Sequence, residues 1–200
     1  MPPELIDLLI HLRRATMLKM REKVTTERLR IFMREMARRT QGAGRVYFTG
    51  GSTALLLGLR EQTIDVDIKV DPEPRGIFEA IANLKNELNL NVELASPDDF
   101  IPAPPGWQDL AKPIEKIGDI SFFHYDLCMQ ALAKIERGFS QDLADARGLV
   151  ERDFISIENL QKRFAQIEAQ FIRYPVINPD EFKAKLEAFI SSLSEEPHDE

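Results

Sequence analysis

Two acidic residues lie one position apart in a strand-like run. Asp65 and Asp67 alternate there with Val66 and Ile68. Because successive side chains of a strand point to opposite faces, we expect both carboxylates on one face and both apolar side chains in the core. Carboxylates fixed on one face of a strand can bind Mg²⁺, and two such ions about 3.5–4 Å apart can activate a hydroxyl and polarise a phosphate. The spacing therefore predicts a magnesium site that acts on phosphate esters.

A third carboxylate, Glu93, has apolar neighbours on both sides, Val92 and Leu94. A carboxylate in such a setting needs a partner, because burying an unpaired charge is costly. A metal ion shared with Asp65 and Asp67 is one such partner, and an arginine in a salt bridge is the alternative. Glu93 is therefore a candidate third metal ligand.

A glycine pair precedes the acidic run. Gly50 and Gly51 allow a close approach of the backbone to a ligand, and Ser52 can donate its hydroxyl and cap the helix that follows. The start of a helix favours anions such as phosphate groups. The alternative is a strand-to-helix turn that needs glycine only for its backbone angles. Combined with the carboxylates, the turn predicts a site for a nucleoside triphosphate.

The elements that must position these residues follow from the apolar periodicity and the turn signals. The expected fold class is α+β, with a small mixed β-sheet flanked by helices and then an α-helical C-terminal part. We divide the chain into basic N-terminal helices (1–44), an α/β core (45–123), a helical region (124–193) and an acidic tail (194–200). Expected strands cover 46–48, 64–70, 91–94 and 113–123, and expected helices cover 4–22, a stretch after Thr25 or Thr26, 52–59, 77–88, 125–137, 140–152, 156–173 and 179–193. We expect Phe78 to face inward, Ser140 to cap the helix that it begins, and the proline-rich loop that starts at Pro97 to lack regular structure.

Bulk properties exclude several classes of protein. Cys128 is the only cysteine, which excludes an internal disulfide and a zinc cluster built on cysteines. Neither a membrane-spanning apolar run nor a signal peptide is evident, so we expect a cytoplasmic protein without a membrane partner.

Charge is distributed unevenly along the chain. The net charge is −7, yet the segment 13–45 carries eleven basic residues against three glutamates, a net +8, which leaves about −15 for the remainder. Segregated positive charge can form a phosphate-binding face, so these basic helices are a candidate contact for tRNA or another RNA. A solvated helix face, or a contact with an acidic partner protein, is the alternative.

The motifs together resemble a known superfamily. The run 49–52, followed by 65–68 and later by 92–94, resembles the signature of nucleotidyltransferases of the DNA-polymerase-β type. Within that superfamily, the run 50–68 is similar to the AbiEii-type toxins of abortive-infection and type IV toxin–antitoxin systems. A lysine-bearing helix followed by acidic residues, here 131–137 and 141–145, is similar to a second element of those toxins.

The resemblance implies roles for individual residues. Asp65 and Asp67 would bind Mg²⁺, and Lys134 would reach the phosphates from the helical side. Asp142 or Asp145 would position Lys134 or the attacking group. The residues that would bind the nucleoside triphosphate are Gly50, Gly51, Ser52, Arg60 and Arg137.

The expected function is Mg²⁺-dependent transfer of a nucleoside monophosphate from a nucleoside triphosphate to a tRNA-like or protein acceptor. The resemblance also implies a toxin with a cognate antitoxin. Two alternatives stay open at this point. One is a module that retains the fold and binds nucleotide, RNA or a partner without turnover. The other is a nucleotidyltransferase that modifies a small molecule of the antibiotic type.

Overall fold

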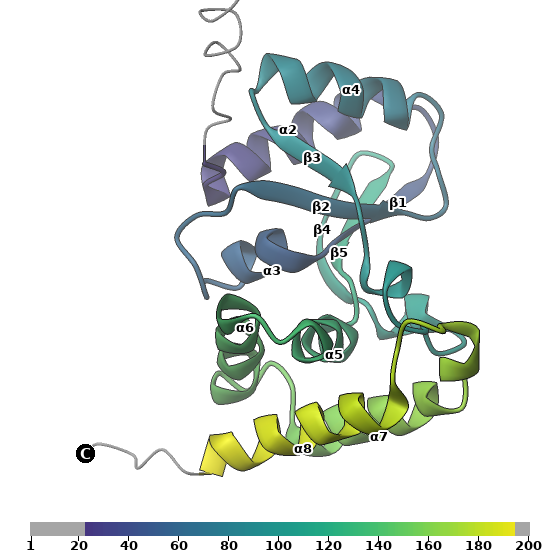
Figure 1. Ribbon diagram of the computed structural model, residues 1–200. Coiled ribbons are helices and arrows are strands. Elements are labelled where there is room, and N and C mark those ends of the chain that lie inside the picture. Colours follow the sequence, from purple (N-terminus) through teal and green to yellow (C-terminus); the bar gives the residue numbers. More distant parts are fainter. Residues whose placement is uncertain (1–22, 195–200) are drawn as a thin grey trace, which may run out of the picture.

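A computed structural model describes residues 23–194 of the chain (Figure 1). The expected helix over 4–22 and nearly all of the expected acidic tail lie outside the described residues. The element labels below follow Figure 1.

The centre of the molecule is a five-stranded mixed sheet with the strand order β3-β2-β1-β5-β4. Its central strand, β1, pairs antiparallel with β2 on one side and parallel with β5 on the other, while β2 pairs parallel with β3 and β4 pairs antiparallel with β5. The strand bounds are β1 Gly44–Phe48, β2 Asp65–Val70, β3 Asn91–Leu94, β4 Lys112–Ile117 and β5 Ile120–His124.

Two helices cover one face of the sheet, α2 (Thr26–Arg39) and α4 (Ile77–Glu87), which lie above it in Figure 1. Thr25 caps α2, because its side chain accepts a hydrogen bond from the backbone N–H of Arg28. Apolar side chains of both helices pack against strand residues such as Val66 and Ile68, and this forms the first hydrophobic core.

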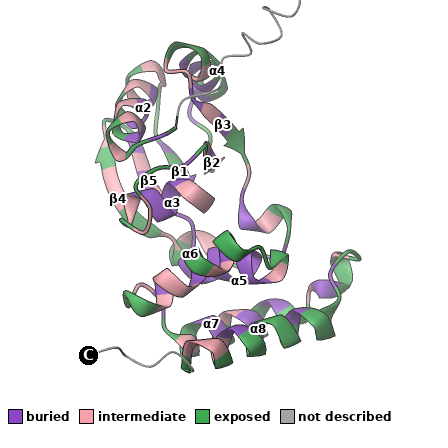
Figure 2. Cartoon of the chain, turned by 60° about the vertical axis from the view of Figure 1, so that its left-hand side comes forward, coloured by how far each residue is buried: buried purple, intermediate pink, exposed green. Residues whose placement is uncertain are grey.

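The remaining helices lie on the opposite side of the sheet. They are α3 (Gly50–Leu56), α5 (Leu127–Arg137), α6 (Ser140–Glu151), α7 (Ile157–Glu168) and α8 (Pro179–Ser194). Every residue of α5 from Leu127 to Ile135 is buried, which is typical of a helix enclosed on all sides (Figure 2). A second hydrophobic core surrounds α5 and includes Tyr47 of β1. The mixed sheet, its flanking helices and the helical C-terminal part confirm the expected fold class.

Three local expectations were wrong. Phe78 was expected to face inward, but 43% of its surface is exposed. The N-cap position of α6 is Phe139, without a side-chain cap, whereas we expected Ser140. The proline-rich loop contains two short 3₁₀ helices, η1 (Pro97–Asp99) and η2 (Trp107–Leu110), and Trp107 anchors that loop by stacking on Tyr125 with ring centroids 4.6 Å apart.

Candidate functional site

A cleft of about 240 Å³ lies where the amino-terminal half of β2, the end of β3, the start of α3, the η1 turn and α5 meet. One wall of the cleft is acidic, and the α5 wall carries basic side chains. The residues that line the cleft are Thr49, Gly50, Asp65, Asp67, Glu93, Ala95, Ser96, Pro97, Phe100, Gln130, Ala133, Lys134 and Arg137.

The acidic wall is formed by the two neighbouring parallel strands. Asp65 and Asp67 face the cleft because Val66 and Ile68, which alternate with them, are buried in the core of the sheet. Glu93 lies beside Asp67 in the strand register. The sequence had therefore predicted the common face of Asp65 and Asp67. The expectation that Glu93 is a buried carboxylate was wrong, because Glu93 and its neighbour Leu94 are exposed. The structure nevertheless gathers all three carboxylates at one cleft.

Asn91 is a member of this wall that the sequence analysis missed. Its side-chain amide donates to Asp65 Oδ1 at 2.6 Å and to Glu93 Oε1 at 2.8 Å. It therefore holds one carboxylate from each strand in place. The available signal was its position two residues before Glu93, which puts both side chains on one face of β3.

The surroundings of Asp67 change the pKa of its carboxyl group. Burial raises the pKa of Asp67 to about 6, and the negative charges of Asp65 and Glu93 add to the effect. Across residues 23–194, no ion pair joins any of these three carboxylates to a basic side chain. The salt bridge to arginine that we considered as an alternative partner is therefore not formed.

Gly50 lies directly against Asp67. Its φ of +55° is one that other residues rarely adopt, and a Cβ at this position would lie 2.5 Å from Asp67 Oδ2. Glycine is therefore required here for two reasons, the backbone angle and the approach of the carboxylate.

Gly51 and Ser52 are placed differently from their expected roles. A Cβ on Gly51 would lie 2.1 Å from Thr63 Oγ1, so this glycine permits close packing against the segment before β2. The Ser52 side chain is buried, and its hydroxyl donates to the backbone oxygen of Asp65 at 3.4 Å. The N-cap position of α3 is Thr49, so Ser52 does not cap the helix as expected. Among the described residues, the cleft lining includes neither Gly51 nor Ser52.

Basic side chains line the cleft on α5. Lys134 and Arg137 are three residues apart and therefore neighbours on one helix face. Lys134 is buried, and its Nζ lies 3.0 Å from Asp142 Oδ1 and 2.6 Å from Asp145 Oδ2. Arg137 also pairs with Asp142, at 2.9 Å. Asp142 therefore pairs with both basic groups, and Asp145 pairs with Lys134.

Arg60 joins this network instead of the cleft lining. Its Nε and a terminal nitrogen donate to the two oxygens of Asp145 at 2.7 and 2.6 Å. Arg60 follows α3, and Asp145 belongs to α6. The ion pair therefore connects the segment between α3 and β2 to helix α6. Asp142 and Asp145 thus contact Lys134 directly, whereas Arg60 contacts Asp145 and is not among the residues that line the cleft.

Oxygen ligands of the acidic wall are of the kind that Mg²⁺ prefers. As the side chains stand, no group of three or more acidic, histidine or cysteine residues between 23 and 194 is arranged to hold a metal ion. The expected three-carboxylate shell of Asp65, Asp67 and Glu93 is therefore not assembled around one point. Mg²⁺ commonly takes one or two protein carboxylates and completes its shell with substrate phosphates, and the Asp65–Asp67 pair fits that requirement.

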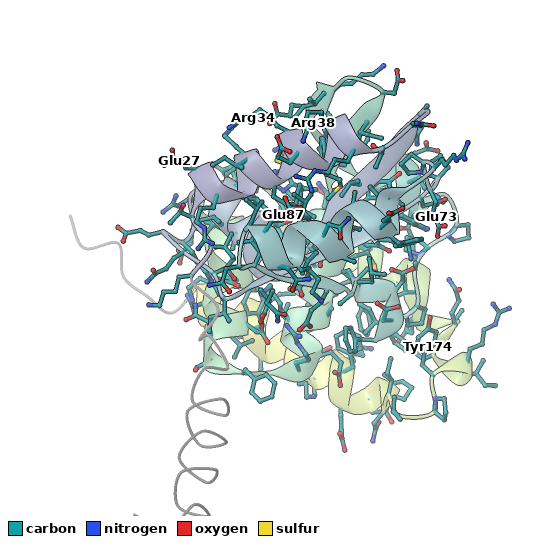
Figure 3. All side chains as sticks on the ribbon, turned by 90° about the horizontal axis from the view of Figure 1, so that it is seen from above. Glu27, Arg34, Arg38, Glu73, Glu87 and Tyr174 are labelled. Atoms are coloured by element: carbon teal, nitrogen blue, oxygen red, sulfur yellow. The ribbon has the colours of Figure 1, made fainter. Side chains whose placement is uncertain are left out.

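The basic helix α2 lies on the far face of the sheet from this cleft. Arg38 and Arg39 pair with Glu35, Arg39 pairs also with Glu87 of α4, and Arg30 pairs with Glu115. Figure 3 looks onto this face and shows Arg34 and Arg38 along α2, with Glu87 on the neighbouring helix. Much of the positive charge described there is therefore neutralised within the protein. Arg13, Arg14, Lys19 and Arg21 of the basic segment lie outside the described residues.

Between residues 23 and 194, no helix has the length and apolar character needed to cross a membrane.

Comparison with known proteins places the chain in a family. Residues 27–192 match the model of a family described as "nucleotidyltransferase of unknown function" (DUF6036). The chain belongs to this family. No curated protein and no solved structure matches the chain. Membership of this nucleotidyltransferase family agrees with the superfamily resemblance and supports a transferase at that level. The closer similarity to AbiEii-type toxins stays a prediction.

Proposed function

We propose that the protein transfers a nucleoside monophosphate from a nucleoside triphosphate to a hydroxyl group of an acceptor, with Mg²⁺. The observation that carries this proposal is the cleft between an acidic and a basic wall. Asp65, Asp67 and Glu93 lie on one side, and Lys134 and Arg137 lie on the other. A family described as nucleotidyltransferases is consistent with it.

The two walls suit different parts of the substrate. The triphosphate is highly charged, and Lys134 and Arg137 offer the positive charge that it needs during phosphate transfer. Asp65 and Asp67 are the residues that would hold Mg²⁺, which supplies polarisation of the α-phosphate and neutralisation of the leaving pyrophosphate. Gly50 leaves the space that the Asp67 carboxylate occupies.

The reaction is a substitution at phosphorus. The acceptor oxygen forms a bond to the α-phosphorus, the bond between that phosphorus and the bridging oxygen to the β-phosphate breaks, and pyrophosphate leaves while the hydroxyl proton passes to water. Asp142 and Asp145 do not touch the substrate in this scheme. They hold the Lys134 ammonium group at the cleft through their contacts at 3.0 and 2.6 Å.

The acceptor that we propose is a tRNA-like RNA or a protein, as in the toxins that the sequence resembles. That similarity supports this choice over a small molecule of the antibiotic type. A toxin role with a cognate antitoxin is part of the same proposal.

Incubation with each labelled nucleoside triphosphate, Mg²⁺ and total tRNA tests the proposal. We expect transfer of label by the wild type, and loss of transfer in Asp65→Asn and Asp67→Asn. Glu79→Gln, an exposed carboxylate of α4 on the other face of the sheet, is the matched control and should retain transfer. Nucleotide binding without transfer to RNA or to any protein of a cell extract would contradict the proposal and favour the binding module.

A further inference from the structure

An exposed aromatic side chain stands at the edge of the cleft. Phe100 follows η1 and lines the cleft with 48% of its surface exposed. Ile101, the next residue, is fully buried in the core around α5 and anchors the segment. Phe100 is therefore not needed to hold the loop down, and its exposure requires another explanation.

The turn that carries Phe100 is firmly braced. Asp99 Oδ2 accepts from the backbone N–H of Ser96 at 2.7 Å, and the Ser96 hydroxyl donates to Asp98 Oδ1 at 2.5 Å. Lys69 pairs with Asp98 at 2.6 Å, and the Tyr174 hydroxyl donates to the Asp98 backbone oxygen at 3.2 Å. The aromatic ring is thus presented from a fixed turn, which reduces the entropic cost of stacking a ligand on it.

A second, independent feature of the same cleft indicates a ligand that donates hydrogen bonds. Gln130 lines the cleft and is 2% exposed. Its amide nitrogen donates to the Tyr125 backbone oxygen at 2.9 Å and to Thr53 Oγ1 at 3.2 Å, which fixes the orientation of the amide.

Gln130 Oε1 is consequently left buried without a hydrogen-bond partner in the described structure. A buried acceptor without a partner is costly, and a donor from a ligand would remove that cost. An ionised phosphate offers no donor, whereas a nucleoside offers amino and hydroxyl groups. The cleft therefore suits the nucleoside part of the substrate as well as its phosphates.

We propose that Phe100 forms the stacking surface for the nucleobase of the substrate. The inference rests on the proposed function, since it assigns the nucleoside end of the same cleft. Aromatic side chains stack on every base, so Phe100 contributes affinity for all four nucleoside triphosphates without selecting one of them.

Calorimetric titration of the full chain with Mg²⁺ and either a nucleoside triphosphate or tripolyphosphate separates the two ends of the cleft. We expect Phe100→Ala to weaken the binding of each nucleoside triphosphate about tenfold, the loss typical of one stacked base, and to leave tripolyphosphate affinity unchanged. Phe139→Ala removes another exposed phenylalanine, 67% exposed and outside the cleft lining, and should change neither affinity.

Phe100→Trp gives a second, optical readout. Trp107 is the only native tryptophan, so the added indole signal is measured as the difference from the wild type. We expect quenching by nucleoside triphosphates and none by tripolyphosphate, because only the former carry a base.

Equal affinities of Phe100→Ala and the wild type for nucleoside triphosphates would overturn the inference, as would an equal loss of tripolyphosphate affinity. The proposed function fails separately if the wild type binds nucleotide without transferring it, and the comparison of Phe100→Ala with the wild type still decides the inference in that case. If the wild type binds neither ligand, or if Asp67→Asn and Lys134→Met bind both ligands as tightly as the wild type, no nucleotide occupies this cleft and both proposals fall.

Discussion

Replacing Gly50 by alanine tests whether the position of the Asp67 carboxylate is essential for the reaction. The new Cβ would lie 2.5 Å from Asp67 Oδ2, whereas ordinary van der Waals contact begins near 3.4 Å. The carboxylate must therefore move by about 1 Å, and a displacement of that size at a reacting centre can cost about 100-fold in rate. The contact is with the end of a flexible side chain, so we expect the fold to persist.

The backbone strain of this variant has a matched control. Gly118, in the turn between β4 and β5, has a φ of +58° against +55° for Gly50, and a Cβ there would meet no atom within 4 Å. A left-handed backbone angle in a non-glycine residue costs about 1–2 kcal/mol. Both substitutions should therefore lower the free energy of unfolding by a similar amount, while only Gly50→Ala displaces Asp67.

Two measurements on each variant decide the matter. Urea unfolding gives the stability loss, and the transfer assay with labelled nucleoside triphosphate gives the rate at saturating Mg²⁺. We expect comparable stability losses and a rate loss of about 100-fold in Gly50→Ala alone. Equal rates in the two variants would refute the idea that the Gly50–Asp67 approach serves the reaction.

Three further outcomes follow from the structure. Asp145→Asn should lower the free energy of unfolding by about 3–5 kcal/mol, because the Asp145 side chain is 3% exposed and compensates the charges of both Arg60 and Lys134. Asp142→Asn should lower it by less, because the Asp142 side chain is 12% exposed, and equal losses in urea unfolding would contradict this account. Burial lowers the pKa of His124 from 6.5 to about 4, so the folded protein keeps this group neutral while the unfolded chain takes up a proton. The free energy of unfolding should therefore fall by about 3 kcal/mol between pH 6.5 and pH 4, and comparing wild type with His124→Gln in urea unfolding at several pH values isolates that loss. Removal of divalent cations with EDTA should abolish transfer reversibly but leave the circular dichroism spectrum unchanged, since both hydrophobic cores are built from apolar side chains.

The acidic wall was accessible to prediction because strand geometry leaves few choices. Alternation of Asp65 and Asp67 with two apolar residues fixes their common face without any knowledge of neighbouring strands. Lys134 and Arg137 were identified through the resemblance to the AbiEii-type toxins, and helical spacing adds only that they share one helix face. Local periodicity therefore carries the information for the acidic pair alone.

Other parts of the site depend on contacts that periodicity does not encode. The interaction of Asn91 with both acidic strands requires the β2–β3 register, and Arg60 meets Asp145 across 85 positions of sequence. Phe100 follows a short 3₁₀ turn in the proline-rich loop, and the many prolines of that loop had led us to expect no regular structure there. Helix α3 begins at Gly50, two residues earlier than expected, and the Ser52 side chain consequently points into the protein interior.

The charge of α2 is a similar case. Counting residues along the chain, Glu35 included, gave a strongly positive segment, but Glu87 of α4 and Glu115 of β4 also pair with its arginines. Only the tertiary arrangement shows that this helix is separated from the cleft by the sheet.

The central strand β1 has a consequence for how the molecule unfolds. Tyr47 belongs to the core around α5, while Val46 and Phe48 belong to the core beneath α2 and α4. One five-residue strand therefore links both cores, so neither can lose its packing without disturbing the other. The protein should unfold in a single cooperative transition, with the amide protons of β1 among the slowest to exchange with solvent. A ligand bound in the cleft would then protect both cores from exchange together.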